Sequence, residues 1–239
     1  MSELKNKTIT VRHADGRGHA DFGWLDSYHT FSFGEYQDPE HTRFRTLRVI
    51  NDDTVQPGNG FDAHPHRDME IISYVIEGEL EHKDSLGHGS VLTAGEVQAI
   101  CAGTGITHSE FNPSAAHPVH FLQIWIFPGE KGLKPRYQQL PLSGLKKDRG
   151  LTLFASNREE DRCLFISQDA RVYHGQLARG QSRVYPATPD RGLWVQMITG
   201  ELTLDGQSLK TGDGAAIEHA QEITLKSPEA SEFLLFDLK

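Results

Sequence analysis

Two short pairs of metal-ligating residue types are the chemically most specific feature of this sequence. The first pair is His64 and His66, and the second is His108 and Glu110. Side chains alternate between the two faces of an extended segment, so residues i and i+2 point the same way. Two such pairs brought face to face would form a pocket with three imidazoles and one carboxylate. That ligand set suits a first-row divalent ion with room for an exogenous ligand.

The residues around both pairs favour extended, turn-bounded segments. Pro65 fixes its own φ, pushes His64 toward extended geometry and lacks an N–H, as fits a strand start or edge. Ala102-Gly103-Thr104-Gly105 is a glycine turn that lets the chain swing inward before the second pair. The elements required are therefore strands at the rim of a barrel.

Other polar residues near these pairs have two interpretations each. Glu70 continues the parity of the first histidine pair, and we expect it to orient a ligand or to be structural rather than to act as a fifth ligand. His82 and His88 flank a polar hairpin loop and are expected to be exposed. Gln123 shares its parity with Phe121 and Trp125, which is typical of core packing, although it could also line a pocket.

Composition limits the possible classes of function. The 239 residues allow one large or two small domains, and the net charge of −9 argues against a nucleic-acid-binding surface or docking on anionic lipid. No apolar run is long enough to span a membrane, and the first residues lack the apolar core of a secretory signal. The two cysteines, Cys101 and Cys163, form no disulfide framework, which suits a cytoplasmic protein.

Short β-type runs separated by turn residues dominate the sequence, as in a sandwich or barrel. The strands that we expect are Thr46–Asn51, Met69–Ile76, Glu79–Lys83, Val97–Cys101, Val119–Phe127, Leu151–Ala155, Val172–Ala178, Leu193–Thr199, Gly214–Glu218 and Glu232–Leu238. Short helices have room within 131–145 or 155–161. His29, Phe31 and Phe33 share one face, which favours a strand covering a barrel edge over a role in stacking on a substrate.

The sequence is also internally repeated. The segment from Tyr74 to Leu80, around Gly78, is echoed by the segment from Gln196 to Leu202, around Gly200. Shared order predicts two barrels by duplication, with domains at 1–145 and 146–239. The second copy lacks any His-x-His pair, so we expect it to be structural or to close the entrance to the first.

These motifs resemble the cupin signature. Its first half stands here as Gly58-x5-His64-x-His66-x3-Glu70-x7-Gly78, and its second as Gly95-x5-Cys101-x-Gly103-x4-His108-x3-Asn112. The second half has Cys101 in place of proline and two extra residues before the histidine. With those departures the chain is similar to the pirins, whose motifs match in order at 17–33, 60–70, 102–110 and 135–138.

The resemblance implies an all-β bicupin, with two antiparallel β-barrel (jelly-roll) domains packed together. Carried over, the pirin metal ligands fall on His64, His66, His108 and Glu110, the four residues already selected by spacing. The resemblance implies one divalent ion, Fe(II) first, with Mn, Ni, Co, Cu or Zn as alternatives.

The likeness to short bacterial pirins described as quercetin 2,3-dioxygenases implies an enzyme that cleaves a flavonol such as quercetin with O2 and releases carbon monoxide. Glu110 would be the catalytic base for the substrate hydroxyl. A non-enzymatic, redox-sensing metal protein that acts through protein partners is the alternative, and a cupin isomerase or sugar-binding protein is the third class.

Overall fold

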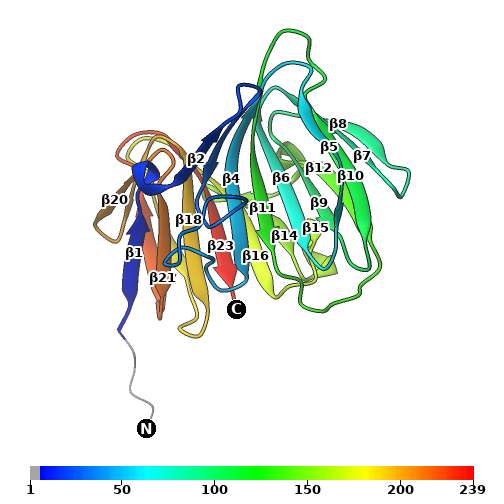
Figure 1. The fold of residues 1–239 in the computed structure, drawn as a ribbon. Helices are drawn as coiled ribbons and strands as arrows, with labels where there is room; N and C mark the ends of the chain where they lie inside the picture. The colour runs from blue at the N-terminus through cyan, green and yellow to red at the C-terminus, as the bar shows by residue number, and fades with distance from the viewer. Residues whose placement is uncertain (1–5) are drawn as a thin grey trace. The chain divides into compact units, whose positions relative to one another are not determined.

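A computed structural model describes residues 6–239, which fold into two compact units. The first unit contains Gly18–Leu145 and Ser156–Gln168. The second contains residues 6–17, Lys146–Ala155 and Asp169–Lys239. Both units are built from antiparallel strands, and the described helices are single 3-10 turns (Figure 1).

Two sheets make up the first unit. One has the order β12-β9-β6-β11-β4-β3-β2, and the other the order β5-β10-β7-β8. The strands of these sheets are β2 (Gly18–Asp21), β3 (Leu25–His29), β4 (Leu47–Val55), β5 (Gly60–His66), β6 (Glu70–Glu77), β7 (Glu79–Asp84), β8 (Gly89–Thr93), β9 (Glu96–Cys101), β10 (Ile106–Phe111), β11 (Val119–Ile126) and β12 (Arg136–Pro141). The two-residue strand β15 (Leu164–Phe165) also falls in this unit but is in neither sheet. The 3-10 turns η2 (Leu142–Gly144) and η3 (Glu159–Asp161) also lie in this unit.

The second unit repeats this plan. Its sheets have the orders β1-β21-β18-β23-β16-β14-β13 and β17-β22-β19-β20. The elements are β1 (Thr8–Arg12), η1 (Ala14–Gly16), β13 (Lys147–Asp148), β14 (Leu151–Ser156), β16 (Ala170–Leu177), β17 (Ser182–Pro186), β18 (Gly192–Thr199), β19 (Glu201–Leu204), β20 (Gln207–Lys210), β21 (Gly214–Glu218), β22 (Glu222–Lys226) and β23 (Ser231–Leu238).

The strand order explains the internal repeat. The run β9-β6-β11-β4 of the first unit corresponds to β21-β18-β23-β16 of the second. Gly78 ends β6 with a φ of 80°, and Gly200 ends β18 with a φ of 79°, so each repeat turns at a residue that tolerates this conformation. The repeat predicted from sequence is therefore confirmed as a repeat of topology, while a domain boundary between residues 145 and 146 stays a prediction.

Apolar side chains from both sheets fill the interior of each unit. In the first unit, Leu80 and Leu92 from the smaller sheet pack with Val75 and Phe121 from the larger one. The core of the second unit includes Leu202, Leu204, Leu209, Ile223 and Leu225 from its smaller sheet, packed against apolar residues of β18, β21 and β23. The interior of the second unit is thus occupied by hydrocarbon rather than by polar ligands.

All ten strands expected from the sequence are present, with ends that differ by a few residues. Both regions with room for short helices contain one 3-10 turn each, η2 and η3. None of the helices within residues 6–239 has the length or apolar character needed to cross a membrane.

Candidate metal centre

The two predicted ligand pairs lie on neighbouring strands of the smaller sheet of the first unit. β10 pairs with β5 so that His108 is directly opposite His64, and His66 is opposite Ile106. The ring centroids of His64, His66 and His108 lie 4.6 to 4.9 Å from one another. One ligating nitrogen from each ring lies within 4.8 Å of the others, as a shared cation requires.

A backbone contact sets the tautomer of His64. Its Nδ1 lies 2.7 Å from the carbonyl oxygen of Asp62, which can only accept a hydrogen bond. Nδ1 therefore holds the proton, and Nε2 keeps the lone pair that a metal needs.

The other two imidazoles are neutral and available. Burial, reinforced by the neighbouring histidines, lowers the pKa of His66 to about 4 and that of His108 to about 3. His108 is 1% exposed, and neither of its ring nitrogens has a hydrogen-bond partner. A buried imidazole with two unpartnered nitrogens, beside two more imidazoles, fits a divalent cation.

Glu110 is buried beside His108 and is held by three side-chain donors. Its Oε1 accepts hydrogen bonds from Gln98 Nε2 at 2.6 Å and Ser73 Oγ at 3.0 Å, and its Oε2 accepts one from Gln123 Nε2 at 2.7 Å. A carboxylate oxygen of Glu110 lies within 4.8 Å of a ring nitrogen of His82 and of one of His108. Glu110 is not part of the cluster formed by His64, His66 and His108. Its role as the fourth ligand stays a prediction.

A cavity of about 760 Å³ opens against this cluster. His64, His66 and Glu110 form part of its wall, together with the aromatic residues Trp24, Phe33, Tyr36, Phe61 and Trp125. The Trp125 ring meets that of His66 edge to face at 5.0 Å and that of Phe33 at 5.4 Å. This volume and lining suit a planar aromatic ligand.

The structure decides between the alternative interpretations of several cavity residues. Gln123 both lines the cavity and binds Glu110, so its pocket-lining interpretation is confirmed. His29 and Phe33 also line the cavity, whereas Phe31, 2% exposed, lies in the core.

A patch of polar residues in the same cavity was not anticipated from the sequence. Ser27, Asn51 and Asp53 line it from β3 and β4. Ser27 Oγ donates a hydrogen bond to Asp53 Oδ1, and Asn51 Oδ1 lies 2.9 Å from His29 Nδ1. Burial, and secondarily the charges of Asp52 and Glu110, raise the pKa of Asp53 to about 7. Period-two alternation along Leu47–Val55 was the available signal, because Asn51 and Asp53 share the parity of the buried Val49 and Val55.

Glu70 has a structural partner. It is fully buried, and its Oε1 accepts hydrogen bonds from both the backbone N–H, at 2.9 Å, and the hydroxyl of Ser167. These contacts attach the segment around Ser167 to β6, and among the described residues Glu70 belongs to no metal-ligating group.

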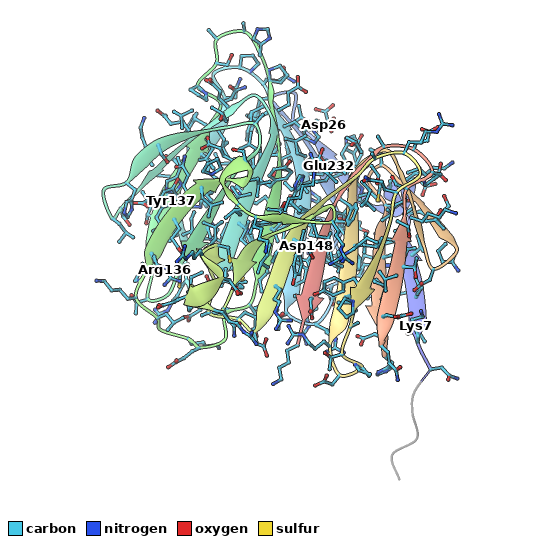
Figure 2. All side chains as sticks on the ribbon, turned by 180° about the vertical axis from the view of Figure 1, so that it is seen from behind. Lys7, Asp26, Arg136, Tyr137, Asp148 and Glu232 are labelled. Carbon is cyan, nitrogen blue, oxygen red and sulfur yellow. The ribbon has the colours of Figure 1, made fainter. Side chains whose placement is uncertain are left out.

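The expectation that His82 is exposed is wrong. Its side chain is fully buried, and its ring lies 5.5 Å from that of His108. The same ring stacks at 4.4 Å on that of Tyr137 of β12, the residue labelled in Figure 2. Leu80 faces the core, so the same parity along β7 places His82 inside, a signal that the polar composition of the loop concealed. His88, with a side chain 45% exposed, follows the expectation.

Both metal-ligating groups found among the described residues lie in the first unit. In the second unit, His219 Nδ1 lies 3.3 Å from the carbonyl oxygen of Pro189, and His174 Nε2 lies 2.8 Å from Glu232 Oε1. The chemistry therefore concentrates in the first unit, as the sequence indicated.

Comparisons with known proteins agree with this arrangement. Residues 10–126 match the pirin family, and residues 153–238 match the family described as quercetinase C-terminal cupin domain. The chain is 45% identical over 230 residues to the quercetin 2,3-dioxygenase of Escherichia coli K12. This match covers 96% of this chain and 98% of the relative. The chain is 44% identical over 233 residues to a putative quercetin 2,3-dioxygenase of Pasteurella multocida, covering 96% and 98%.

The fold of this chain also superposes on solved structures of similar proteins. The crystal structure of the bacterial pirin YhhW from Escherichia coli in complex with nickel(II) superposes with a TM-score of 0.92 at 45% identity, over 97% of this chain and 99% of that one. The expected all-β fold with two cupin domains is confirmed. By sequence and structure, this chain belongs to the pirin family.

Proposed function

We propose that this protein is a metal-dependent dioxygenase of the quercetinase type, which opens the central ring of quercetin or a related flavonol with O2. The observation that carries the proposal is the three-histidine cluster in the wall of an aromatic-lined cavity of about 760 Å³. The similarity to relatives named quercetin 2,3-dioxygenase supports the choice of substrate.

The proposed ligands of the metal are His64, His66, His108 and Glu110. When bound there, a divalent ion supplies Lewis-acid charge that lowers the pKa of a coordinated hydroxyl. Three imidazole nitrogens and one carboxylate would hold such an ion. Fe(II) is the metal that we propose, although affinity alone favours copper or zinc in such a site, so metal supply decides which ion is bound.

The cavity residues bind and orient the substrate. Trp125 and Phe33 offer an aromatic corner against which a flat ring system can pack, next to His66. Ser27 of β3 and Asn51 of β4 offer polar groups to the hydroxyls of the ring system. Such directional contacts fix the orientation of a ligand whose faces are apolar.

Glu110 is the proposed acceptor of the substrate hydroxyl proton. Gln98, Ser73 and Gln123 direct their hydrogen-bond donors at its two oxygens, which fixes the position of the carboxylate. These contacts hold the base in one place beside the histidines, where it can accept the proton of the substrate hydroxyl as it loosens from the ligand set. We further propose that the protein acts in the cytoplasm, without direct contacts to nucleic acid.

The test is oxygen uptake with quercetin by protein loaded with Fe(II), Mn(II), Ni(II), Co(II) or Cu(II). We expect rapid, metal-dependent uptake that His108→Ala abolishes. The exposed His117 of the same unit provides the matched control, and His117→Ala should retain full activity. Stoichiometric metal binding without uptake for any metal would refute the oxygenase and favour the redox-sensing regulator that acts through protein partners.

A further inference from the structure

Among the described residues, three buried imidazole nitrogens at the metal cluster have no hydrogen-bond partner. They are Nδ1 of His82 and both Nδ1 and Nε2 of His108. A metal ion accounts for only one nitrogen of His108, because an imidazole ligand donates one lone pair. The second nitrogen of His108 and the Nδ1 of His82 still require an explanation, since buried polar groups are nearly always paired.

The strand register places these two rings side by side. β10 pairs with β7 so that Glu110 is opposite His82 and His108 is opposite Asp84. All four side chains therefore share one face, and His82 is the diagonal neighbour of His108. Their ring centroids are 5.5 Å apart, and a nitrogen of each lies within 4.8 Å of the other.

Asp84 determines which nitrogen of His82 holds the proton. The Nε2 of His82 lies 3.1 Å from Asp84 Oδ2, in a pair whose side chains are both fully buried. The other oxygen, Oδ1, accepts hydrogen bonds from the backbone N–H groups of Leu86 at 2.8 Å and His88 at 3.1 Å. A carboxylate that only accepts requires the proton on Nε2, so Nδ1 of His82 is a bare acceptor.

His108 needs such an acceptor. If one of its nitrogens binds a metal, the other must hold a proton and donate it. We propose that His82, anchored by Asp84, accepts this hydrogen bond and thereby fixes the tautomer and ring orientation of His108. His82 is thus a positioning residue in a buried chain that runs from Asp84 through His82 and His108 to the metal, and it rests on the ligand set proposed above.

The contacts around His82 fix the position of its ring. Tyr137 stacks on it with an interplanar angle of 15°, and the Tyr137 hydroxyl lies 2.6 Å from Ser90 Oγ. Tyr137 and Asp84 thus hold the ring of His82 in place beside that of His108.

The test compares metal binding by three folded variants with that of the wild-type protein. His82→Phe keeps an aromatic ring against Tyr137 but removes the acceptor, whereas His82→Gln keeps an acceptor toward His108 and a donor toward Asp84. His88→Phe is the matched control, because His88 also contacts Asp84 and stacks on Tyr137 at 5.2 Å but is half-exposed.

Nickel(II) affinity is measured by competition with a chelator. We expect His82→Phe to bind roughly 10- to 100-fold more weakly, the usual loss when the partner of a ligating histidine is removed. His82→Gln should recover most of the affinity, and His88→Phe should bind like the wild type. Paramagnetic proton NMR of the cobalt(II) protein supplies a second readout, in which His82→Phe loses the slowly exchanging ring N–H signal of one coordinated histidine.

The outcomes separate this inference from the proposed function. Wild-type protein that binds no stoichiometric metal would defeat the ligand set and the chain together. Tight wild-type binding that His82→Phe leaves unchanged, with every N–H signal retained, would overturn the chain alone. A second equivalent of metal that His82→Phe abolishes would also overturn it, since His82 would then be a ligand. If His82→Phe does not fold, Asp84→Asn decides: it frees the tautomer of His82 and should weaken binding several-fold, and unchanged affinity would overturn the chain.

Discussion

Replacing Asp53 by asparagine should change how the stability of the metal-free protein depends on pH. Asp53 is 3% exposed, and burial raises its pKa from 3.8 to about 7. An unfolded chain restores the ordinary value, so between these two pKa values the folded state binds more protons than the unfolded state. The free energy of unfolding therefore falls as pH rises from about 4, and the loss is complete once pH exceeds the folded pKa near 7.

The size of the effect follows from the same two pKa values. A difference of one in pKa corresponds to about 1.36 kcal/mol, so a carboxyl whose pKa rises from 3.8 to about 7 costs the fold up to about 4 kcal/mol at pH 8. Asparagine has nearly the same shape, accepts the hydrogen bond from Ser27 and never ionises. The stability of Asp53→Asn relative to wild type should consequently rise by up to about 4 kcal/mol between pH 4 and pH 8.

Urea denaturation at several pH values, followed by tryptophan fluorescence, measures this difference. Subtracting the two proteins cancels the contributions of the other titrating groups. Glu79→Gln, at an exposed carboxylate of the same unit, is the control and should give a nearly flat difference. A difference between Asp53→Asn and wild type that stays constant within about 1 kcal/mol from pH 5 to pH 8 would refute the reasoning, because Asp53 would then ionise like an exposed carboxyl.

Three further predictions concern Glu70, Trp125 and Cys101. Glu70→Gln should leave nickel affinity within about two-fold of wild type. It should lower the free energy of unfolding by about 1.5–3 kcal/mol, because Ser167 loses a carboxylate acceptor. A large loss of affinity in chelator competition would make Glu70 a ligand. Trp125→Ala should bind metal normally yet raise the KM for quercetin about ten-fold or more, since a stacking surface is lost; an unchanged KM in oxygen-uptake kinetics would contradict the proposed binding mode. Burial and the charge of Glu70 raise the pKa of Cys101 to about 11, so iodoacetamide at pH 8 should leave it unmodified in the folded protein, as peptide mass spectrometry would reveal.

The fold was predictable where strands are long and apolar. β6, β11, β18 and β23 are central strands buried on both faces, and their continuous hydrophobic runs identify them. Strands such as β17 and β20 escaped detection because they are short, lie at sheet edges and consist largely of polar residues. Pairing partners, rather than local sequence, make these segments strands.

The histidine cluster was predictable because its spacing is local, whereas the groups around it depend on register. Residues i and i+2 of one strand share a face whatever the fold, so His64 and His66 could be paired from sequence alone. The approach of His82 to His108 depends on how β7 and β10 align, and the depth of Asp53 depends on β3 and β11 flanking β4. Such cross-strand relations involve residues distant in sequence, and no local pattern specifies them.

The first strand of the chain has a consequence for biosynthesis. Within residues 6–239, β1 pairs only with β21, so that Thr10 is opposite Ala216. At about 5–20 residues per second, the roughly 200 intervening residues take on the order of 10–40 s to synthesise. Throughout that interval the nascent β1 has no hydrogen-bonding partner, and once β21 emerges it remains an open sheet edge until β1 returns to it. The second unit therefore cannot complete its larger sheet until β21 has been synthesised, and until then a ribosome-bound chain leaves β1 accessible to chaperones or to neighbouring nascent chains.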